Sequence, residues 1–191
     1  METLKKLDAD LFLYLNNAGS ESWDKFWMIL TDQWLAIPLY VILALMILWK
    51  TGFKSAVISG AMILATVVVT YIISYLLKNG VARLRPCNVY DIYTEIRFPL
   101  KEIGKGCGTY GFVSSHATVA TGMIVLIGMI LKKYFKFIMP VLIVWLMLFS
   151  YSRIYLGKHY PGDIIAGFII GVIIGFTAYK LRLWIERKWA I

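Results

Sequence analysis

Five apolar runs constrain this chain more than any other feature of its sequence. The hydrocarbon core of a bilayer is about 30 Å thick, and a helix of roughly 20 apolar residues crosses it. Within that core only helices and closed barrels satisfy every backbone polar group. We therefore expect an all-α integral membrane bundle of five to six transmembrane helices, forming one domain. The five runs are Trp34–Trp49, Ser55–Leu77, Ser114–Leu131, Phe137–Tyr151 and Pro161–Tyr179.

The composition agrees with a membrane protein and excludes several other classes. Hydrophobic residues make up 60% of the chain and charged residues 16%, whereas soluble domains contain about 45–50% and about 25%. A disordered chain, a collagen-like fibre and an ordinary cytosolic enzyme are therefore excluded. The formal net charge is +9, and basic residues of membrane proteins gather in cytoplasmic loops or in anion sites. We expect membrane lipids as partners and no nucleic acid.

The N-terminal region, residues 1–33, is predicted to lie at the membrane surface. Leu4, Leu7 and Leu11 recur at helical spacing with charged residues between them, which is typical of an interfacial amphipathic helix. Residues 23–33 combine aromatic side chains with three charged ones. This second stretch either lies on the surface, which we favour, or forms a sixth span.

Basic residues in short connections predict which side of the membrane faces the cytoplasm. With five spans, the connections Lys50–Lys54 and Lys132–Lys136 and the tail from Lys180 lie on one side. Together they contain nine basic residues and one acidic residue. A high density of Lys and Arg in short loops marks the cytoplasmic side. The long outer loop, 78–113, and the connection after Tyr151 then face outward.

Ionisable residues gather beside the outward ends of the spans, although they are spread over 86 positions of the chain. Charged residues within or next to a span are candidate functional residues, because their burial in lipid is costly. Both histidines of the chain belong to this set. The set consists of Lys78, Arg83, Arg85, His116, Arg153, Lys158, His159 and Asp163.

Helix geometry predicts that part of this set forms an anion site. If the second helix continues to Pro86, Lys78 and Arg85 lie seven residues apart on one face. Ser114 and Ser115 precede an apolar run and suit the cap of its helix. The free N–H groups at a helix start attract anions. The long loop and the third span therefore converge on a phosphate-sized ligand.

The fifth span adds a second helix start to the predicted site. Pro161 suits the first turn of a helix, so His159 lies just before that turn. Asp163 is followed by glycines every four residues, from Gly167 to Gly175. Small residues at this spacing allow close packing on another helix. The packing also turns Asp163 into the bundle.

These residue types suit phosphoryl transfer without a metal ion or cofactor. Arg85 and Arg153 can each bind phosphate oxygens through two hydrogen bonds. A neutral histidine acts as a nucleophile when a carboxylate orients its other nitrogen, a role that fits His159 with Asp163. His116 can protonate the leaving oxygen and later activate water. The cations stabilise the charge on the transferring group.

Three sequence motifs contain these residues. Lys78–Pro86 has the pattern Lys-x6-Arg-Pro, Val113–His116 is Val-Ser-Ser-His, and Ser152–Asp163 has the pattern Ser-Arg-x5-His-x3-Asp. Their order and spacing resemble the three signature motifs of the type-2 phosphatidic acid phosphatase family of membrane lipid phosphatases. Val113 and Ser115 stand where the usual middle motif of that family has proline and glycine.

The resemblance implies a helical bundle and a metal-independent reaction through a phosphohistidine. It makes His159 the nucleophile, Asp163 its orienting partner and His116 the general acid. It also assigns phosphate binding to Lys78, Arg85, Ser114, Arg153 and the backbone of Ser115.

Within the family, the short chain, the amphipathic N-terminus and the outward site look most like bacterial undecaprenyl-diphosphate phosphatases. This likeness implies release of phosphate from undecaprenyl diphosphate, giving undecaprenyl phosphate, at the periplasmic or exterior face of the inner membrane. The motifs also fit lipid A 1-phosphatases and phosphatidylglycerophosphate phosphatases. A non-enzymatic carrier of a lipid phosphate is the alternative from another class, although a carrier needs no nucleophile.

The outer loop contains both cysteines of the chain, Cys87 and Cys107. Outside the cytoplasm a disulfide between them is expected, with two reduced thiols as the alternative. The segment Gly104–Gly111 lacks the Gly-Lys-Ser/Thr ending of a nucleotide-binding loop, so we expect a mobile loop there. Arg83 and Lys158 are predicted to contact solvent or lipid headgroups rather than the site.

Overall fold

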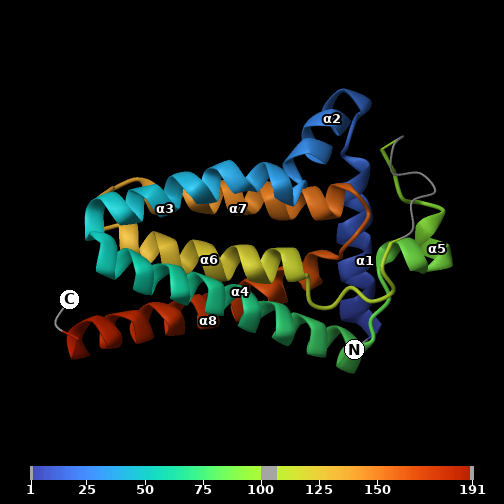
Figure 1. Cartoon of the computed structure of the whole chain (residues 1–191). Coiled ribbons are helices and arrows are strands. Elements are labelled where there is room, and N and C mark those ends of the chain that lie inside the picture. Colours follow the sequence, from blue (N-terminus) through green and yellow to red (C-terminus); the bar gives the residue numbers. More distant parts are fainter. Residues whose placement is uncertain (1, 100–106, 190–191) are drawn as a thin grey trace.

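The computed structural model describes residues 2–99 and 107–189, and its regular structure is helical (Figure 1). In these ranges the extended chain forms only an isolated antiparallel bridge, between Leu84 and Tyr110. The all-α fold expected from the sequence is confirmed. The elements are α1 Glu2–Asn17, α2 Glu21–Leu30, the 3-10 helix η1 Gln33–Ala36, α3 Ile37–Thr51, α4 Phe53–Val81, the 3-10 helix η2 Pro86–Asn88, α5 Tyr90–Tyr93, α6 Ser115–Leu131, α7 Ile138–Tyr155 and α8 Pro161–Lys188.

Five helices, α3, α4, α6, α7 and α8, lie side by side and form the membrane bundle (Figure 1). Each corresponds to one of the predicted apolar runs. Within the described ranges, α4, α7 and α8 have the length and hydropathy of membrane spans, while α3 and α6 are shorter apolar helices of 15 and 17 residues. Large apolar side chains on the outer faces remain exposed, among them Val57, Leu64 and Ile72, as contact with lipid requires.

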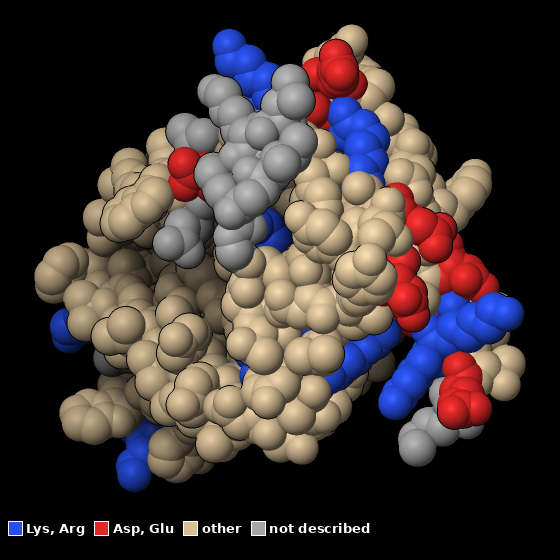
Figure 2. Space-filling view, turned by 90° about the vertical axis from the view of Figure 1, so that its right-hand side faces the viewer, with Lys and Arg blue, Asp and Glu red and all other residues tan. Residues whose placement is uncertain are grey.

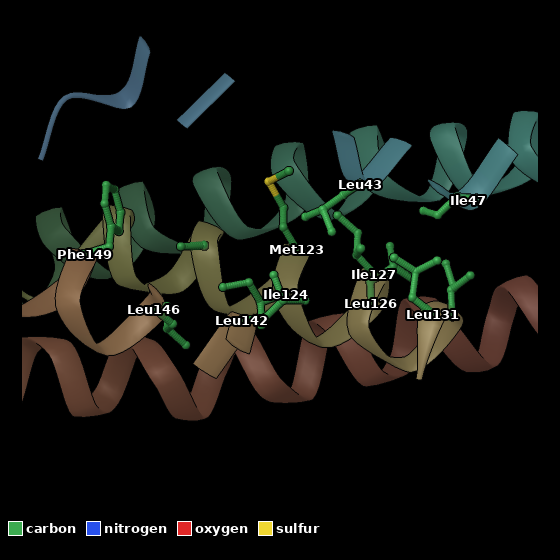
Figure 3. Packing of buried hydrophobic residues seen from close by; sticks show 12 residues of the cluster. Leu43, Ile47, Met123, Ile124, Leu126, Ile127, Leu131, Leu142, Leu146 and Phe149 are labelled. Carbon is green, nitrogen blue, oxygen red and sulfur yellow. The ribbon is translucent and has the colours of Figure 1, made fainter. Parts of the chain in front are cut away.

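The core of the bundle is built around α6, which contacts α3, α4, α7 and α8. Its apolar side chains belong to one buried cluster with those of α3 and α7 (Figure 3), which includes Leu43 of α3, Ile127 of α6 and Leu142 of α7. All three side chains are almost completely buried. These contacts on several sides fix the position of α6. They thereby fix the positions of Ser114 and His116 at its N-terminus.

The glycine stripe of α8 lies against α6, as its spacing predicts. A Cβ atom at Gly171 would lie 2.6 Å from the Thr121 Cβ and 2.7 Å from the Thr118 carbonyl oxygen. Glycine therefore lets the two backbones approach more closely than any other residue would allow. At the start of the same helix, Asp163 is fully buried.

At the end of the bundle where α8 finishes, a buried ionic cluster joins α4 to α8. Arg182 is 3% exposed and donates hydrogen bonds to the hydroxyls of Ser59, at 2.7 Å, and Ser55, at 2.6 Å. It also pairs with Glu186 at 2.6 Å. Because these polar groups satisfy one another, they are tolerated inside an apolar bundle, and they fix α4 against α8.

The amphipathic helix α1 crosses the opposite end of the bundle (Figure 1). Its outer apolar face is exposed, as an interfacial helix requires. Phe12 packs against Tyr160, with ring centroids 5.5 Å apart. The side-chain amide of Asn16 donates to the carbonyl oxygens of Ile154, at 3.1 Å, and Tyr155, at 2.9 Å. Two independent contacts therefore hold α1 on the bundle.

The second N-terminal helix, α2, lies outside the bundle. It has 10 residues and is therefore about 15 Å long, which is too short to cross a bilayer. Trp23 and Phe26 are exposed, as aromatic residues at a membrane interface are. Of the two alternatives for residues 23–33, the length of α2 favours the surface-lying one, which stays a prediction.

The second helix extends past the predicted apolar run, Ser55–Leu77, but it does not continue to Pro86. It ends at Val81, and Ala82 takes the left-handed conformation, with φ of 50°, so the condition under which Lys78 and Arg85 would share one helix face is not met. Asn79–Gly80 is a weak helix-forming pair, which helps the helix to stop. Arg85 therefore reaches the site from an extended segment.

The outer loop continues from this extended segment. Cys87 and Cys107 are joined by a disulfide, which ties the residues after Arg85 to those before Tyr110. Residues 104–106 of the Gly104–Gly111 segment, for which we expected a mobile loop, lie outside the described residues.

The close α6–α8 contact leads to a stability prediction. Gly171→Ala should lower the free energy of unfolding by about 1–3 kcal/mol through overpacking. The midpoint of thermal unfolding of the detergent-solubilised protein should fall by roughly 2–4 °C for each kcal/mol. Gly60→Ala is the matched control, because a Cβ atom there meets nothing within 4 Å. Equal midpoints for the two variants would contradict the described packing.

Candidate active site

His159 lies in the short connection between α7 and α8 and is 1% exposed. Its Nδ1 atom lies 3.4 Å from Oδ2 of Asp163. The pair arises from local structure, because Pro161 begins α8 and Asp163 reaches back to accept the N–H of Tyr160 at 3.1 Å. This capping contact at the start of a helix brings the carboxylate next to the imidazole.

The surroundings of His159 keep its imidazole neutral. Burial, together with the positive charges of Arg85, Arg153 and Lys78, holds the pKa of His159 well below its ordinary value of 6.5. A hydrogen bond with the backbone of Gly111 acts in the opposite direction. At physiological pH the ring is therefore uncharged, which is the form that a nucleophilic histidine requires.

Three cations from three parts of the chain surround this imidazole. Lys78, near the end of α4, donates to the Ser115 hydroxyl at 2.6 Å. Arg85 uses its Nε to bind the Tyr110 carbonyl oxygen at 3.1 Å. Arg153, near the end of α7, is 8% exposed. Its Nη1 donates to the hydroxyl of Thr31, the residue that follows α2, at 2.7 Å.

The N-terminus of α6 forms the remaining side of the site. Ser114 is the N-cap residue, and its side chain accepts the N–H of Ala117 at 3.5 Å. The Ser114 N–H donates to the Asp163 carbonyl oxygen at 3.0 Å, which joins the starts of α6 and α8. His116 is half-buried and is close enough to His159 for their charges to interact. The structure thus brings together all eight residues to which the sequence assigned catalysis or phosphate binding.

An apolar cleft of about 280 Å³ opens beside His116. Ser115 and His116 lie on its polar side, and the remaining lining residues belong to η1, α3, α4, α6 and α7. The cleft lies between membrane helices, and Lys78 binds the hydroxyl of Ser115, one of its lining residues. It therefore offers space for the hydrocarbon part of a lipid whose phosphate lies among the cations. Those other lining residues are Ala36, Tyr40, Val67, Tyr71, Val119, Ala120, Met123 and Phe149.

Arg83 does not have the environment that the sequence suggested. We expected contact with solvent or lipid headgroups, but its Nη1 lies 3.0 Å from Oδ1 of Asp163. The sequence contained one indication of this position. Alternate residues of an extended chain point to the same side, and Arg83 and Arg85 are two residues apart. This spacing was not used, because the interpretation considered a helix through both residues.

Figure 2 shows the end of the bundle where these residues lie. Acidic and basic side chains occur together towards one margin of this face, and basic side chains also lie in recesses between uncharged residues. The arrangement agrees with a cationic site that is set into a surface of mainly uncharged residues. Such a site suits an anionic group attached to a lipid.

Comparisons with known proteins point in one direction. The model of the PAP2 superfamily matches residues 58–187. A lipid A 4'-phosphatase of Bacteroides thetaiotaomicron is 30% identical over 186 residues, which cover 95% of this chain and 81% of that protein. An undecaprenyl-diphosphatase of Sulfolobus acidocaldarius is 31% identical over 122 residues, covering 61% of this chain and 54% of that protein.

A solved structure has the same fold. The crystal structure of a transmembrane PAP2 type phosphatidylglycerolphosphate phosphatase from Bacillus subtilis matches with a TM-score of 0.76 at 19% identity, covering 98% of this chain and 90% of that one. The family match spans more than half of the chain and contains all three motifs. This chain therefore belongs to the PAP2 superfamily of membrane lipid phosphatases and is a hydrolase that acts on phosphate esters.

Proposed function

We propose that this protein removes phosphate from a membrane lipid through a phosphohistidine formed on His159. The observation on which the proposal rests is the buried His159–Asp163 pair, with a neutral imidazole in the field of three cations. A pocket that only bound a lipid phosphate would gain nothing from an oriented nucleophile. The arrangement therefore favours an enzyme over a non-enzymatic carrier.

In the first step the substrate phosphate lies between Lys78, Arg85, Arg153 and the N-terminus of α6. The unprotonated nitrogen of His159 attacks phosphorus, while Asp163 holds the proton on Nδ1 and stabilises the imidazolium that forms. The P–O bond to the lipid breaks as His116 donates a proton to the leaving oxygen. The cations stabilise the charge on the transferring phosphoryl group.

In the second step water replaces the lipid alcohol. His116, now unprotonated, takes a proton from the attacking water, and the P–N bond to His159 breaks. Inorganic phosphate leaves, and both histidines return to their starting protonation states. The same side chain thus acts as acid and then as base, so that no metal ion is needed in either step.

For the substrate we place a lipid A 4'-phosphate first. Similarity to the Bacteroides thetaiotaomicron enzyme extends over 95% of this chain, so it includes parts of the sequence outside the three motifs. Undecaprenyl diphosphate, the substrate expected from the sequence, is the second candidate, since similarity to the Sulfolobus acidocaldarius enzyme covers 61% of the chain. Both are lipid phosphates that the apolar cleft beside His116 would suit.

We also propose that the site faces the periplasm from a bacterial inner membrane. The basic connections Lys50–Lys54 and Lys132–Lys136 lie at the end of the bundle opposite α1 (Figure 1), as cytoplasmic loops would. The disulfide Cys87–Cys107 lies on the α1 side, and disulfides persist in oxidising compartments.

Substitutions in the site should separate catalysis from lipid binding. His159→Ala should reduce phosphate release to background, and Arg85→Ala should lower kcat by about 10²-fold or more, with EDTA present throughout. The matched control is Arg187→Ala, an exposed arginine in the last turn of α8, which should keep wild-type rates. Undiminished release by the His159 variant, or loss of wild-type activity in EDTA, would rule out the mechanism.

A substrate panel tests the finer assignment. Purified enzyme in detergent should release phosphate from lipid A at a higher kcat/KM than from undecaprenyl diphosphate or phosphatidylglycerophosphate. Products should be analysed by mass spectrometry to establish whether the 4'- or the 1-phosphate is lost. A preference for undecaprenyl diphosphate would reverse the order of the two candidates without affecting the phosphatase assignment.

The neutral state of His159 predicts the acid side of the pH profile. Because the pKa of this imidazole is depressed, protonation removes the nucleophile only well below pH 6.5. The acid limb of kcat/KM should therefore have its midpoint below pH 6.5. The parameter to measure is kcat/KM, which reports the free enzyme, the state to which this depressed pKa belongs. A midpoint near 7 would be incompatible with the described environment.

A further inference from the structure

Arg83 joins the catalytic end of α8 to the interfacial helix α1. Its Nη2 lies 2.7 Å from Oδ2 of Asp8, while its Nη1 lies 3.0 Å from Oδ1 of Asp163. A guanidinium group presents its donors in a rigid planar fork, so one arginine can orient two carboxylates at once. The Arg83 guanidinium also lies over the Tyr160 ring, 3.9 Å from its centroid, which further restricts its position.

Asp8 makes a second contact at the start of α8. Its Oδ1 accepts the N–H of Gly162 at 2.8 Å, one residue before Asp163. A Cβ atom at Gly162 would lie only 2.7 Å from Oδ2 of Asp8, so glycine leaves room for the carboxylate. Thus α1 supplies an anion to the N-terminus of α8, where the helix dipole favours one.

The contacts of Asp163 show why its orientation matters. Oδ2 faces His159 at 3.4 Å and accepts the Tyr160 N–H at 3.1 Å. Oδ1 is bound by Arg83. Each oxygen of this fully buried carboxylate therefore has a partner, and loss of the Arg83 contact would allow the group to rotate away from the imidazole.

The Asp8–Arg83 pair is not needed simply to attach α1. Phe12 and Asn16 fix that helix to the bundle through separate contacts one to two turns farther along. Asp8 and Arg83 are also partly shielded from solvent, at 16% and 21% side-chain exposure. A pair with this burial, in contact with a catalytic carboxylate, suits a role in catalytic geometry.

We propose that Asp8 and Arg83 are positioning residues for the phosphatase reaction, which set the orientation of Asp163 and thereby that of His159. The proposal rests on the function proposed above, in which Asp163 orients the nucleophile. It assigns to α1 a direct influence on the catalytic step. Groups that orient a reactive residue typically contribute factors of about 10 to 100 in activity.

The test is a double-mutant cycle on phosphate release, with kcat and KM measured separately. Arg83→Gln should lower kcat about 10- to 100-fold and change KM less than about 2-fold, because Arg83 acts through Asp163 rather than on the substrate. In an Asp163→Asn background the same substitution should cause no further loss. A structural role for Arg83 would instead give equal losses in both backgrounds and would overturn the proposal.

Asp8 provides a second variant and a matched control. Asp8→Asn retains an oxygen that can accept the Gly162 N–H but loses the charge that pairs with Arg83, so kcat should fall about 3- to 10-fold. Asp10→Asn makes the same chemical change at an exposed position of α1 and should keep the wild-type kcat. Equal rates for these two variants would exclude a role for Asp8.

Further measurements separate the possible failures. Arg83→Lys keeps the charge but presents no fork, so its kcat should stay below that of the wild type; a wild-type kcat in Arg83→Lys would contradict the role assigned to the fork. Thermal midpoints should show that each variant is folded.

If wild type releases phosphate and His159→Ala does not, unchanged kcat in Arg83→Gln overturns only the positioning role. If His159→Ala remains active, the proposed function itself fails.

Discussion

The site depends on keeping three cations close together in a largely buried place. Like charges at short range in a medium of low dielectric repel strongly. The hydrogen bonds of Lys78 and Arg85 do not remove their charge, because these side chains donate to the Ser115 hydroxyl and the Tyr110 carbonyl oxygen. Neutral acceptors orient a cation and leave its charge available. In the function proposed above, the phosphate group of the substrate brings the negative charge that these two cations attract.

Arg83 shows the contrasting case and explains why neighbouring arginines differ in role. It pairs with the carboxylates of Asp8 and Asp163, so its charge is balanced before any ligand arrives. Arg85, two residues later, binds a neutral carbonyl oxygen. Arg83, whose charge is balanced by carboxylates, is therefore suited to organise the protein. Arg85, whose partner is neutral, is suited to bind an anion.

The helices and the motif residues could be predicted from the sequence, because apolar runs and residue spacing are local properties. The end of α4 could not be predicted, because the sequence before Pro86 is compatible both with a continued helix and with the observed turn at Ala82. The alternating spacing of Arg83 and Arg85 was a local signal, but the partners of Arg83, Asp8 and Asp163, lie 75 and 80 positions away in the chain. Likewise Asp8 lies 154 positions from Gly162, and only the folded chain brings them together.

The interfacial helix α1 has a kinetic consequence. We expect its exposed leucines, Leu4, Leu7 and Leu11, to hold this end of the bundle, and with it His159, at the membrane interface. The enzyme then encounters its lipid by lateral diffusion in two dimensions. Its rate should follow the mole fraction of substrate in the bilayer rather than the amount per volume of solution, so diluting the substrate with inert lipid would slow turnover even when its total quantity is unchanged.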